Sequence, residues 1–320
     1  MSSDNLDQEL GFLKESIDKA IDAAVDGYPC DVPLIREAMA YSVEGGKRLR
    51  GAIVLSTYRS LGGDGDAMPF ALAIEMIQAY SLVHDDLPCM DDDDMRRGRP
   101  TCHKKYGEAI GVLAGDALLT LAFETAASSD LPPYRVVEGV KALAYGAGAA
   151  GMVGGQVLDL QPEAIRCGAC PGDASANDPV DVADPADSAD PANLADPAAQ
   201  ADPADRVRLM YRLKTGRLFE TAARLGAILA GAPAKTVERV GEAGMCFGFS
   251  YQILDDIEDS AQGGMEDKKT TLPRTISLEK AREEAIGGFQ RCKQLTDPGW
   301  LLARLADHYL VTKLGILPSR

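Results

Sequence analysis

Two aspartate clusters lie 170 positions apart in the chain, and each follows an apolar stretch with a helical pattern. The first begins at Asp85 and the second at Asp255. Crowded carboxylates repel one another unless cations lie among them, and their hard oxygen ligands suit magnesium together with substrate phosphates. The two clusters therefore predict a fold in which two helices face each other across a diphosphate that metal ions hold in place.

The position of each cluster on its helix supports this interpretation. Asp255 and Asp259 are four residues apart and share one helix face, with Asp256 beside them. Pro88 lacks an N–H group, so it is expected to end or kink the first helix at its carboxylates. Both clusters thus lie toward helix C-terminal ends, where the macrodipole disfavours anions and favours a compensating metal. A solvated acidic turn is the simpler explanation only for residues 92–94, because apolar neighbours surround the other carboxylates.

Hydrophobic periodicity predicts an all-α protein with a single domain over residues 1–320. Hydrophobic residues make up 46% of the chain and aromatic residues only 6%, so small and aliphatic side chains must build the core. Stretches rich in Ala, Leu, Glu and Arg favour helix, and we find no convincing alternation of a strand. Helices are expected at 5–26, 33–60 (two helices around a turn), 67–87, 105–128, 133–160, 206–231, 233–259 and 277–312.

Residues 162–205 interrupt the helical pattern. Asp-Pro recurs there every six residues, and the segment holds ten acidic side chains and one basic side chain. Prolines at this spacing oppose a helix, and few large apolar groups are present to offset the entropy of ordering. We expect a disordered, extended insertion within the domain. It is either a tandem expansion tolerated on the surface or an acidic interaction arm.

Charge and hydropathy narrow the class of protein. The net charge of −16 disfavours nucleic acid as a partner. No uncharged apolar run reaches 18 residues, so no membrane span is expected. Residues 1–10 lack the basic and apolar parts of a leader, which favours a cytoplasmic location.

Groups of basic residues accompany the aspartates. Some follow the clusters directly, and others lie on a glycine-led turn or near the middle of the chain. Arginine binds phosphate oxygens through its planar fork and lysine binds them as a point charge. Together with the aspartates, they predict two anion sites, one reached through metal and one through side chains directly. The basic residues are Lys47, Arg50, Arg96, Arg97, Lys214, Lys268 and Lys269.

Eight motifs follow one another in a specific order, at residues 45–50, 85–91, 96–98, 113–116, 154–159, 214–216, 252–256 and 269–273. In these motifs the sequence resembles the bacterial short-chain trans-prenyl diphosphate synthases, the family that contains farnesyl and geranylgeranyl diphosphate synthases. The likeness covers most of the chain outside the insertion. A series of this length is far more specific than any single aspartate-rich segment.

The resemblance implies the isoprenoid synthase fold, a helical bundle around a central apolar cavity. It also implies a homodimer, isopentenyl diphosphate and an allylic diphosphate as substrates, and about three magnesium ions per site. Dimethylallyl and geranyl diphosphate are the expected allylic substrates. The implied metal ligands are Asp85, Asp86, Asp91, Asp255, Asp256 and Asp259.

The resemblance further implies two groups of phosphate-binding residues. Arg96, Lys214 and Lys269 would assist the metals at the allylic diphosphate. At Gln78 many bacterial members carry histidine, and glutamine keeps a hydrogen-bonding group there without a cationic form. The metal-free site for isopentenyl diphosphate is implied at Lys47, Arg50, Gln78 and Arg97.

The implied catalytic residues are Lys214, Thr215 and Gln252. Metal and cations neutralise the leaving diphosphate, so that the allylic C–O bond ionises. The oxygens of Thr215 and Gln252 would stabilise the carbocation that results. The alkene of isopentenyl diphosphate then attacks head to tail, and the released diphosphate takes up the proton that is lost.

Product length is expected to depend on Tyr80 and its neighbour Ser81. Tyr80 precedes Asp85 by five residues, which places it about 7.5 Å deeper along the same helix. In the family, an aromatic residue there, with two extra residues between Asp85 and Asp91, resembles the bacterial farnesyl type. A small residue or methionine accompanies geranylgeranyl products. We therefore expect farnesyl diphosphate.

Three alternatives remain open from the sequence. The same chemistry stopping at geranylgeranyl diphosphate is the nearest. A class I terpene cyclase would not need a second, metal-free diphosphate site. A catalytically impaired regulatory subunit is the third, because the loop after Asp259 is shorter than in the family and the C-terminus extends past the usual basic ending.

Overall fold

The computed structural model describes residues 3–167, 202–261 and 270–316. Within these residues the protein is almost entirely helical, which confirms the all-α prediction. The elements are α1 (Ser3–Asp26), α2 (Pro33–Val43), α3 (Leu49–Ser60), α4 (Met68–Asp85), β1 (Met95–Arg96), β2 (Arg99–Pro100), α5 (Cys102–Tyr106), α6 (Glu108–Ala127), α7 (Pro133–Ala147), α8 (Met152–Cys167), α9 (Pro203–Tyr211), the π-helical turn η3 (Arg212–Gly216), α10 (Arg217–Ala230), α11 (Ala234–Ala261), α12 (Leu272–Ile276), α13 (Leu278–Leu295) and α14 (Leu301–Thr312).

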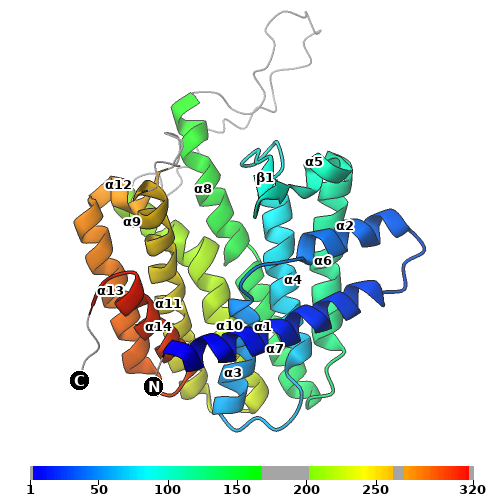
Figure 1. Ribbon diagram of the computed structural model, residues 1–320, viewed down its shortest axis with the longest axis horizontal. Helices are drawn as coiled ribbons and strands as arrows, with labels where there is room; N and C mark the ends of the chain where they lie inside the picture. The colour runs from blue at the N-terminus through cyan, green and yellow to red at the C-terminus, as the bar shows by residue number, and fades with distance from the viewer. Residues whose placement is uncertain (1–2, 168–201, 262–269, 317–320) are drawn as a thin grey trace, which may run out of the picture.

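Helix α4 lies at the centre of the bundle. It is apolar on all sides, and every residue from Phe70 to Ile77 is buried, as expected of a helix that neighbours surround. Helices α3, α6 and α10 pack against one another or against α4, and α11 packs between α10 and α13 (Figure 1). The carboxyl ends of α4 and α11 carry the two aspartate clusters. The packing of these long helices therefore determines where the clusters meet.

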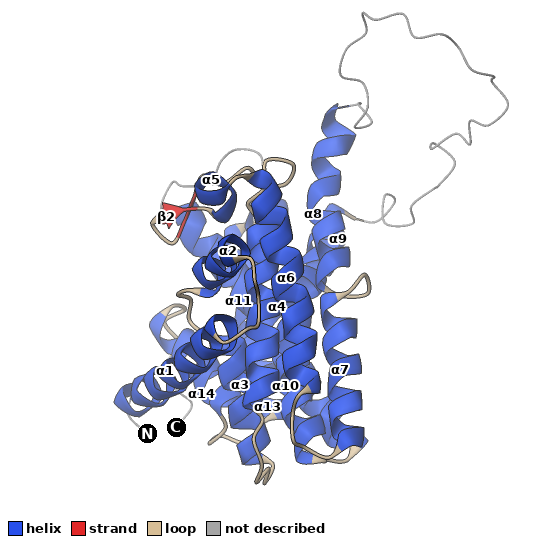
Figure 2. Ribbon diagram, turned by 90° about the vertical axis from the view of Figure 1, so that its right-hand side faces the viewer, coloured by secondary structure: helices blue, strands red, loops and turns tan. Residues whose placement is uncertain are grey.

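Helix α1 lies on the outside of the bundle and is inclined to the long helices α4 and α6, as Figure 2 shows. Its inner face is apolar, with Leu13, Ile17 and Ile21 almost fully buried. It also contacts the C-terminal part of the chain through an ion pair between Glu9 and Arg304 of α14. The N-terminal helix thus covers one side of the core, and its Asp18 binds Arg48 of the turn at residues 45–50.

The structure departs from the expected elements in several places. A two-strand antiparallel hairpin, β1–β2, follows the first cluster, although no strand was expected. Its turn residues Arg97 and Gly98 have φ values of 53° and 76°, the conformation that tight hairpins favour. The expected helix 133–160 is broken between α7 and α8 by a Gly-Ala-Ala-Gly segment. Pro298 followed by Gly299 separates α13 from α14.

The two ends of the predicted insertion, residues 162–205, are helical. Helix α8 continues to Cys167 and α9 begins at Pro203. The Asp202 side chain caps α9 by accepting a hydrogen bond of 2.8 Å from the backbone N–H of Ala204. Because a proline at the first helical position has no N–H to leave unpaired, the last Asp-Pro pair starts a helix instead of preventing one. Residues 168–201 lie outside the described residues.

Helix α6 has an unusual surface for a helix of the bundle. Among the described helices it is the one whose length and apolar composition suffice to cross a membrane. Of its most apolar segment, 39% is buried within the protein. Packing against α4, and also against α2, α5 and α7, accounts for the buried part. Val112 and Leu113 remain 40% and 53% exposed. These two side chains, which we call the exposed apolar stripe of α6, have no partner in the described part of the chain.

Candidate active site

Two adjoining cavities lie at the carboxyl ends of α4 and α11. One has a volume of about 540 Å³ and is lined by apolar side chains such as Tyr80, Met152 and Leu160 together with polar and charged ones; we call it the apolar cavity. The other has a volume of about 490 Å³ and we call it the polar cavity. They share five residues at their junction, namely Asp85, Arg96, Lys214, Thr215 and Gln252.

The polar cavity is lined by six carboxylates from four parts of the chain. Desolvating so many like charges is costly, so a cavity of this kind is suited to cations or to a complex of cations with an anion. These carboxylates belong to Asp85, Asp91, Asp93, Asp159, Asp256 and Asp259.

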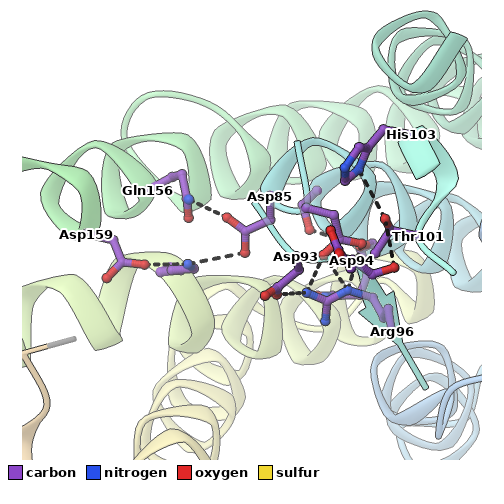
Figure 3. Close-up of polar contacts among 12 residues, drawn as sticks. Asp85, Asp93, Asp94, Arg96, Thr101, His103, Gln156 and Asp159 are labelled. Atoms are coloured by element: carbon purple, nitrogen blue, oxygen red, sulfur yellow. Dashed lines mark hydrogen bonds and ion pairs between the residues drawn. The ribbon is translucent and has the colours of Figure 1, made fainter. Parts of the chain in front are cut away.

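Asp85 is joined to helix α8 and to η3. The Gln156 side chain donates a hydrogen bond to one Asp85 oxygen, and Lys214 lies 3.3 Å from the other (Figure 3). The same amine binds Asp159 at 2.5 Å. Burial disfavours the charged form of Lys214, but Asp159 and Asp85 outweigh this effect, so the pKa of Lys214 lies above its ordinary value. Lys214 is thus a charged group held at the junction of the two cavities.

Asp86 has a different environment from Asp85. It is only 3% exposed, and both of its oxygens accept hydrogen bonds from Arg96 Nε, at 2.7 and 2.9 Å. Arg96 also lies 3.5 Å from Asp93. The carboxylate of Asp86 is thus engaged by the guanidinium of Arg96, and Asp86 lines neither of the two cavities.

The aspartates of the second cluster divide between the two cavities. Asp255 lines the apolar cavity, whereas Asp256 and Asp259 line the polar one. Burial raises the pKa of Asp255 to about 6, although Lys47 lowers it in part. One oxygen of Asp256 accepts a 3.0 Å hydrogen bond from the Gln252 side chain, and the other accepts one from the Tyr211 hydroxyl.

Thr215 and Gln252 form a pair at the junction of the cavities. Thr215 Oγ1 donates to Gln252 Oε1 at 2.7 Å, so two oxygens lie side by side at the mouth of the apolar cavity. Thr215 and Lys214 both belong to η3, a π-helical turn between α9 and α10. Such turns are rare and occur frequently at functional sites. Here the turn directs consecutive side chains toward the cavities.

The expected metal-free anion site is arranged around the turn at residues 45–50. Arg50 and Gln78 line the apolar cavity, and Arg50 lies over the Phe219 ring at 4.3 Å from its centroid. Lys47 donates a 3.0 Å hydrogen bond to the Tyr251 hydroxyl. Arg97 donates to the Glu44 carbonyl at 2.9 Å and packs against the two glycines of the turn. The structure therefore brings Arg97 to the turn that carries Lys47 and Arg50.

Tyr80 and Ser81 both line the apolar cavity. Tyr80 is 6% exposed, and its ring meets that of His84 edge to face with centroids 5.8 Å apart. Burial raises the pKa of Tyr80 to about 12, so the phenol remains neutral. The Ser81 hydroxyl donates to the backbone carbonyl of Gln78. Tyr80 thus forms part of the wall of the apolar cavity.

The donor set fits magnesium bound together with a diphosphate. In the described ranges, no three acidic, histidine or cysteine side chains lie close enough together to form a metal site on their own. Magnesium commonly takes one or two carboxylates and completes its octahedron with phosphate oxygens and water. Carboxylates spread around one polar cavity suit that mode, with Asp85 and Asp91 on one side and Asp256 and Asp259 on the other.

Some residues of the site carried no role in the sequence prediction. Gln156 and Asp159 were part of a motif, and their spacing of three residues on one helix face was the available signal. Arg48 is 5% exposed and binds Asp18 at 2.7 Å, so it anchors the turn at residues 45–50 to helix α1. Tyr211 gave no sequence signal. Lys268 and Lys269 lie outside the described residues.

A helical bundle with two aspartate clusters above an apolar cavity defines the class of all-α isoprenoid synthases. Residues 32–284 match the polyprenyl synthetase family, and the chain belongs to that family. It is a short-chain prenyltransferase.

Individual relatives agree with this assignment. The chain is 40% identical to the large subunit 1 of a heterodimeric geranylgeranyl pyrophosphate synthase from Arabidopsis thaliana, over 85% of this chain and 68% of the relative. A farnesyl/geranylfarnesyl (FPP/GFPP) synthase from Zymomonas mobilis superposes with a TM-score of 0.74 at 31% identity, covering 96% of this chain and 98% of that one. A geranyltranstransferase from Thermotoga maritima gives 0.72 at 26% identity, covering 96% and 99%.

Proposed function

We propose that this protein condenses dimethylallyl or geranyl diphosphate with isopentenyl diphosphate, head to tail, to form farnesyl diphosphate. The observation that carries the proposal is the junction of a carboxylate-lined cavity with an apolar cavity that Tyr80 lines. The first suits a metal-bound diphosphate and the second suits a prenyl chain. Lys214, Thr215 and Gln252 lie where the two meet, beside the bond that would break.

Each residue group has a role in this proposal. Magnesium, when bound, supplies positive charge to the leaving diphosphate. Asp85, Asp91, Asp256 and Asp259 would hold it, with Asp255 at the edge and Asp86 holding Arg96. Arg96 and Lys214 would contact the allylic diphosphate directly, with Lys269 as an expected third cation. The metal-free site would consist of Lys47, Arg50, Gln78 and Arg97.

The chemistry at the reacting carbon would be electrostatic. The oxygens of Thr215 and Gln252, which are hydrogen-bonded to each other, would stabilise the charge of the developing carbocation without attacking it. The anion site around Arg50 would position the alkene of isopentenyl diphosphate. Exclusion of water from the two cavities would protect the allylic carbocation from hydrolysis.

A geranylgeranyl product is the second candidate. It is favoured by the names of the relatives, since the Arabidopsis large subunit and a Capsicum annuum protein 37% identical to this chain are both called geranylgeranyl pyrophosphate synthases. The position of Tyr80 on the cavity wall favours the shorter product. The bulk of one buried side chain thus separates the two candidates.

A homodimer is the proposed assembly. The exposed apolar stripe of α6, formed by Val112 and Leu113, is the surface that a second copy would cover. Adjacent exposed apolar side chains are favoured at interaction surfaces. A different second subunit is the alternative, because the Arabidopsis relative is named as part of a heterodimer.

A product assay tests the proposed function. Purified full-length protein is incubated with magnesium, isopentenyl diphosphate and either dimethylallyl or geranyl diphosphate, and the product length is read by mass spectrometry. A fifteen-carbon product supports the proposal. A twenty-carbon product supports the second candidate and removes the chain-length role of Tyr80. No product from a folded protein contradicts both and favours an impaired subunit.

A further inference from the structure

The hydroxyl of Tyr211 joins two elements that are far apart in the sequence. Tyr211 is the last residue of α9, immediately before η3, and it is 2% exposed. Its hydroxyl donates a hydrogen bond to Asp256 on α11. The same oxygen accepts a 2.9 Å hydrogen bond from the backbone N–H of Leu272, at the start of α12. A phenol has one donor and two acceptor positions, so both bonds form at once.

These bonds act on two walls of the polar cavity. One oxygen of Asp256 accepts from Tyr211 and the other accepts from Gln252, so the direction of the carboxylate is set from both sides. On the other wall, Thr270 and Thr271 line the polar cavity directly before Leu272. The bond from the Leu272 amide to the Tyr211 hydroxyl therefore links the segment at residues 270–272 to the carboxylate of Asp256.

We propose that Tyr211 is a positioning residue of the polar cavity, which orients Asp256 toward a divalent cation bound with diphosphate and ties that carboxylate to residues 270–272. The inference rests on the proposed function and extends it to a residue that does not itself touch the reacting atoms. Removing an outer hydrogen-bond partner of a metal-binding carboxylate commonly weakens metal affinity by about 10- to 100-fold. A neutral phenol suits this task because it directs the carboxylate without cancelling its charge.

The test compares Tyr211→Phe with Tyr58→Phe in the full-length protein. Tyr58 is also 2% exposed, and its hydroxyl also accepts a backbone N–H bond, from Gly65 at 2.7 Å. It does not line either cavity. Each variant removes one hydroxyl and one amide bond from a buried site, and only Tyr211→Phe removes a contact to the aspartate cluster.

Two measurements separate positioning from general stability. In metal-free protein, amide hydrogen exchange should become faster at Leu272 in Tyr211→Phe and at Gly65 in Tyr58→Phe. With inorganic diphosphate present, magnesium is titrated and thermal stabilisation is recorded. The magnesium concentration for half of the full effect should rise about tenfold in Tyr211→Phe and stay unchanged in Tyr58→Phe.

An unchanged magnesium midpoint in Tyr211→Phe would overturn the inference, as would equal midpoint shifts in the two variants or unaltered exchange at Leu272. Failure of the proposed function has a different signature. In that case the unmodified protein would itself show no magnesium-dependent stabilisation by diphosphate, and the inference would fall with it.

Discussion

The burial of the Asp255 side chain makes the stability of the metal-free protein depend on pH. Its burial raises the pKa from 3.8 to about 6, so the ionised form is disfavoured in the metal-free protein. The folded state therefore binds a proton more tightly than the unfolded chain does. Stability from this group is greatest at low pH and falls as the pH rises between these two values.

Asp255→Asn should therefore stabilise the metal-free protein near neutral pH by up to about 3 kcal/mol, because the amide avoids burying a charge. The gain should shrink as the pH falls from 6 and disappear below 3.8, where the carboxyl is protonated in both states. Chemical denaturation in the presence of a chelator, repeated across this pH range, measures the difference. Asp259→Asn is the matched control because Asp259 is exposed, and its effect should be smaller. A destabilised Asp255→Asn at neutral pH would contradict the expectation.

A second prediction at the scale of the residue concerns Tyr80. Tyr80→Ala removes an aromatic ring from the wall of the apolar cavity, so a longer prenyl chain should fit and the main product should shift from fifteen to twenty carbons. The substitution should also lower the free energy of unfolding by about 3–5 kcal/mol. Tyr80→Phe keeps the ring and should keep the product. Mass spectrometry of the products compares the three proteins, and an unchanged product in Tyr80→Ala would remove Tyr80 as the limit.

At the scale of the element, the π-helical turn η3 depends on close approach of α8. Gly155 of α8 faces the turn so closely that a Cβ atom there would lie 2.2 Å from the backbone nitrogen of Lys214. Only glycine allows the two backbones to come so near. The position of Lys214 between Asp85 and Asp159 thus depends on a residue with no side chain at all.

Gly155→Ala should accordingly push α8 away from η3. We expect a loss of about 1–3 kcal/mol in the free energy of unfolding, together with a large fall in kcat, because the contacts of Lys214 are displaced. Gly287→Ala on α13 is the control, since nothing lies within 4 Å of its added Cβ. That variant should gain about 0.5–1 kcal/mol instead. Thermal unfolding and steady-state kinetics distinguish the two, and equal effects would disprove the packing argument.

At the scale of the whole molecule, the exposed apolar stripe of α6 predicts association. Helix α6 is apolar enough to cross a membrane, yet only 39% of its most apolar segment is buried. Apolar area of α6 is therefore exposed to water unless another chain covers it. Residues of α4 line the apolar cavity, and α4 packs against α6, so the proposed interface would lie one helix away from the cavity.

Leu113→Arg should therefore convert a dimer into monomers, because a charged side chain would be desolvated at the centre of the interface. Leu278→Arg on α13 is the matched control, since Leu278 is 55% exposed against 53% for Leu113 and lies on another helix. Light scattering coupled to size-exclusion chromatography gives the mass of each protein. Monomeric unmodified protein, or a dimer that survives Leu113→Arg, would contradict the proposed assembly.

The sequence by itself determined the helical class, the two acidic clusters and the cations around them. It did so because helix periodicity and motif spacing are local properties of the chain. The depth of Tyr80 below Asp85 also follows from helix geometry alone, and the cavity lining agrees with it.

Only the tertiary structure decided how these residues pair. Asp85 and Asp86 are neighbours with the same side chain, yet one meets Lys214 and Gln156 from distant helices while the other is bound by Arg96 on a hairpin. The Tyr211 hydroxyl likewise finds its partners through the packing of α9 against α11 and α12. Contacts of this kind arise where elements far apart in sequence meet, and no local pattern records them.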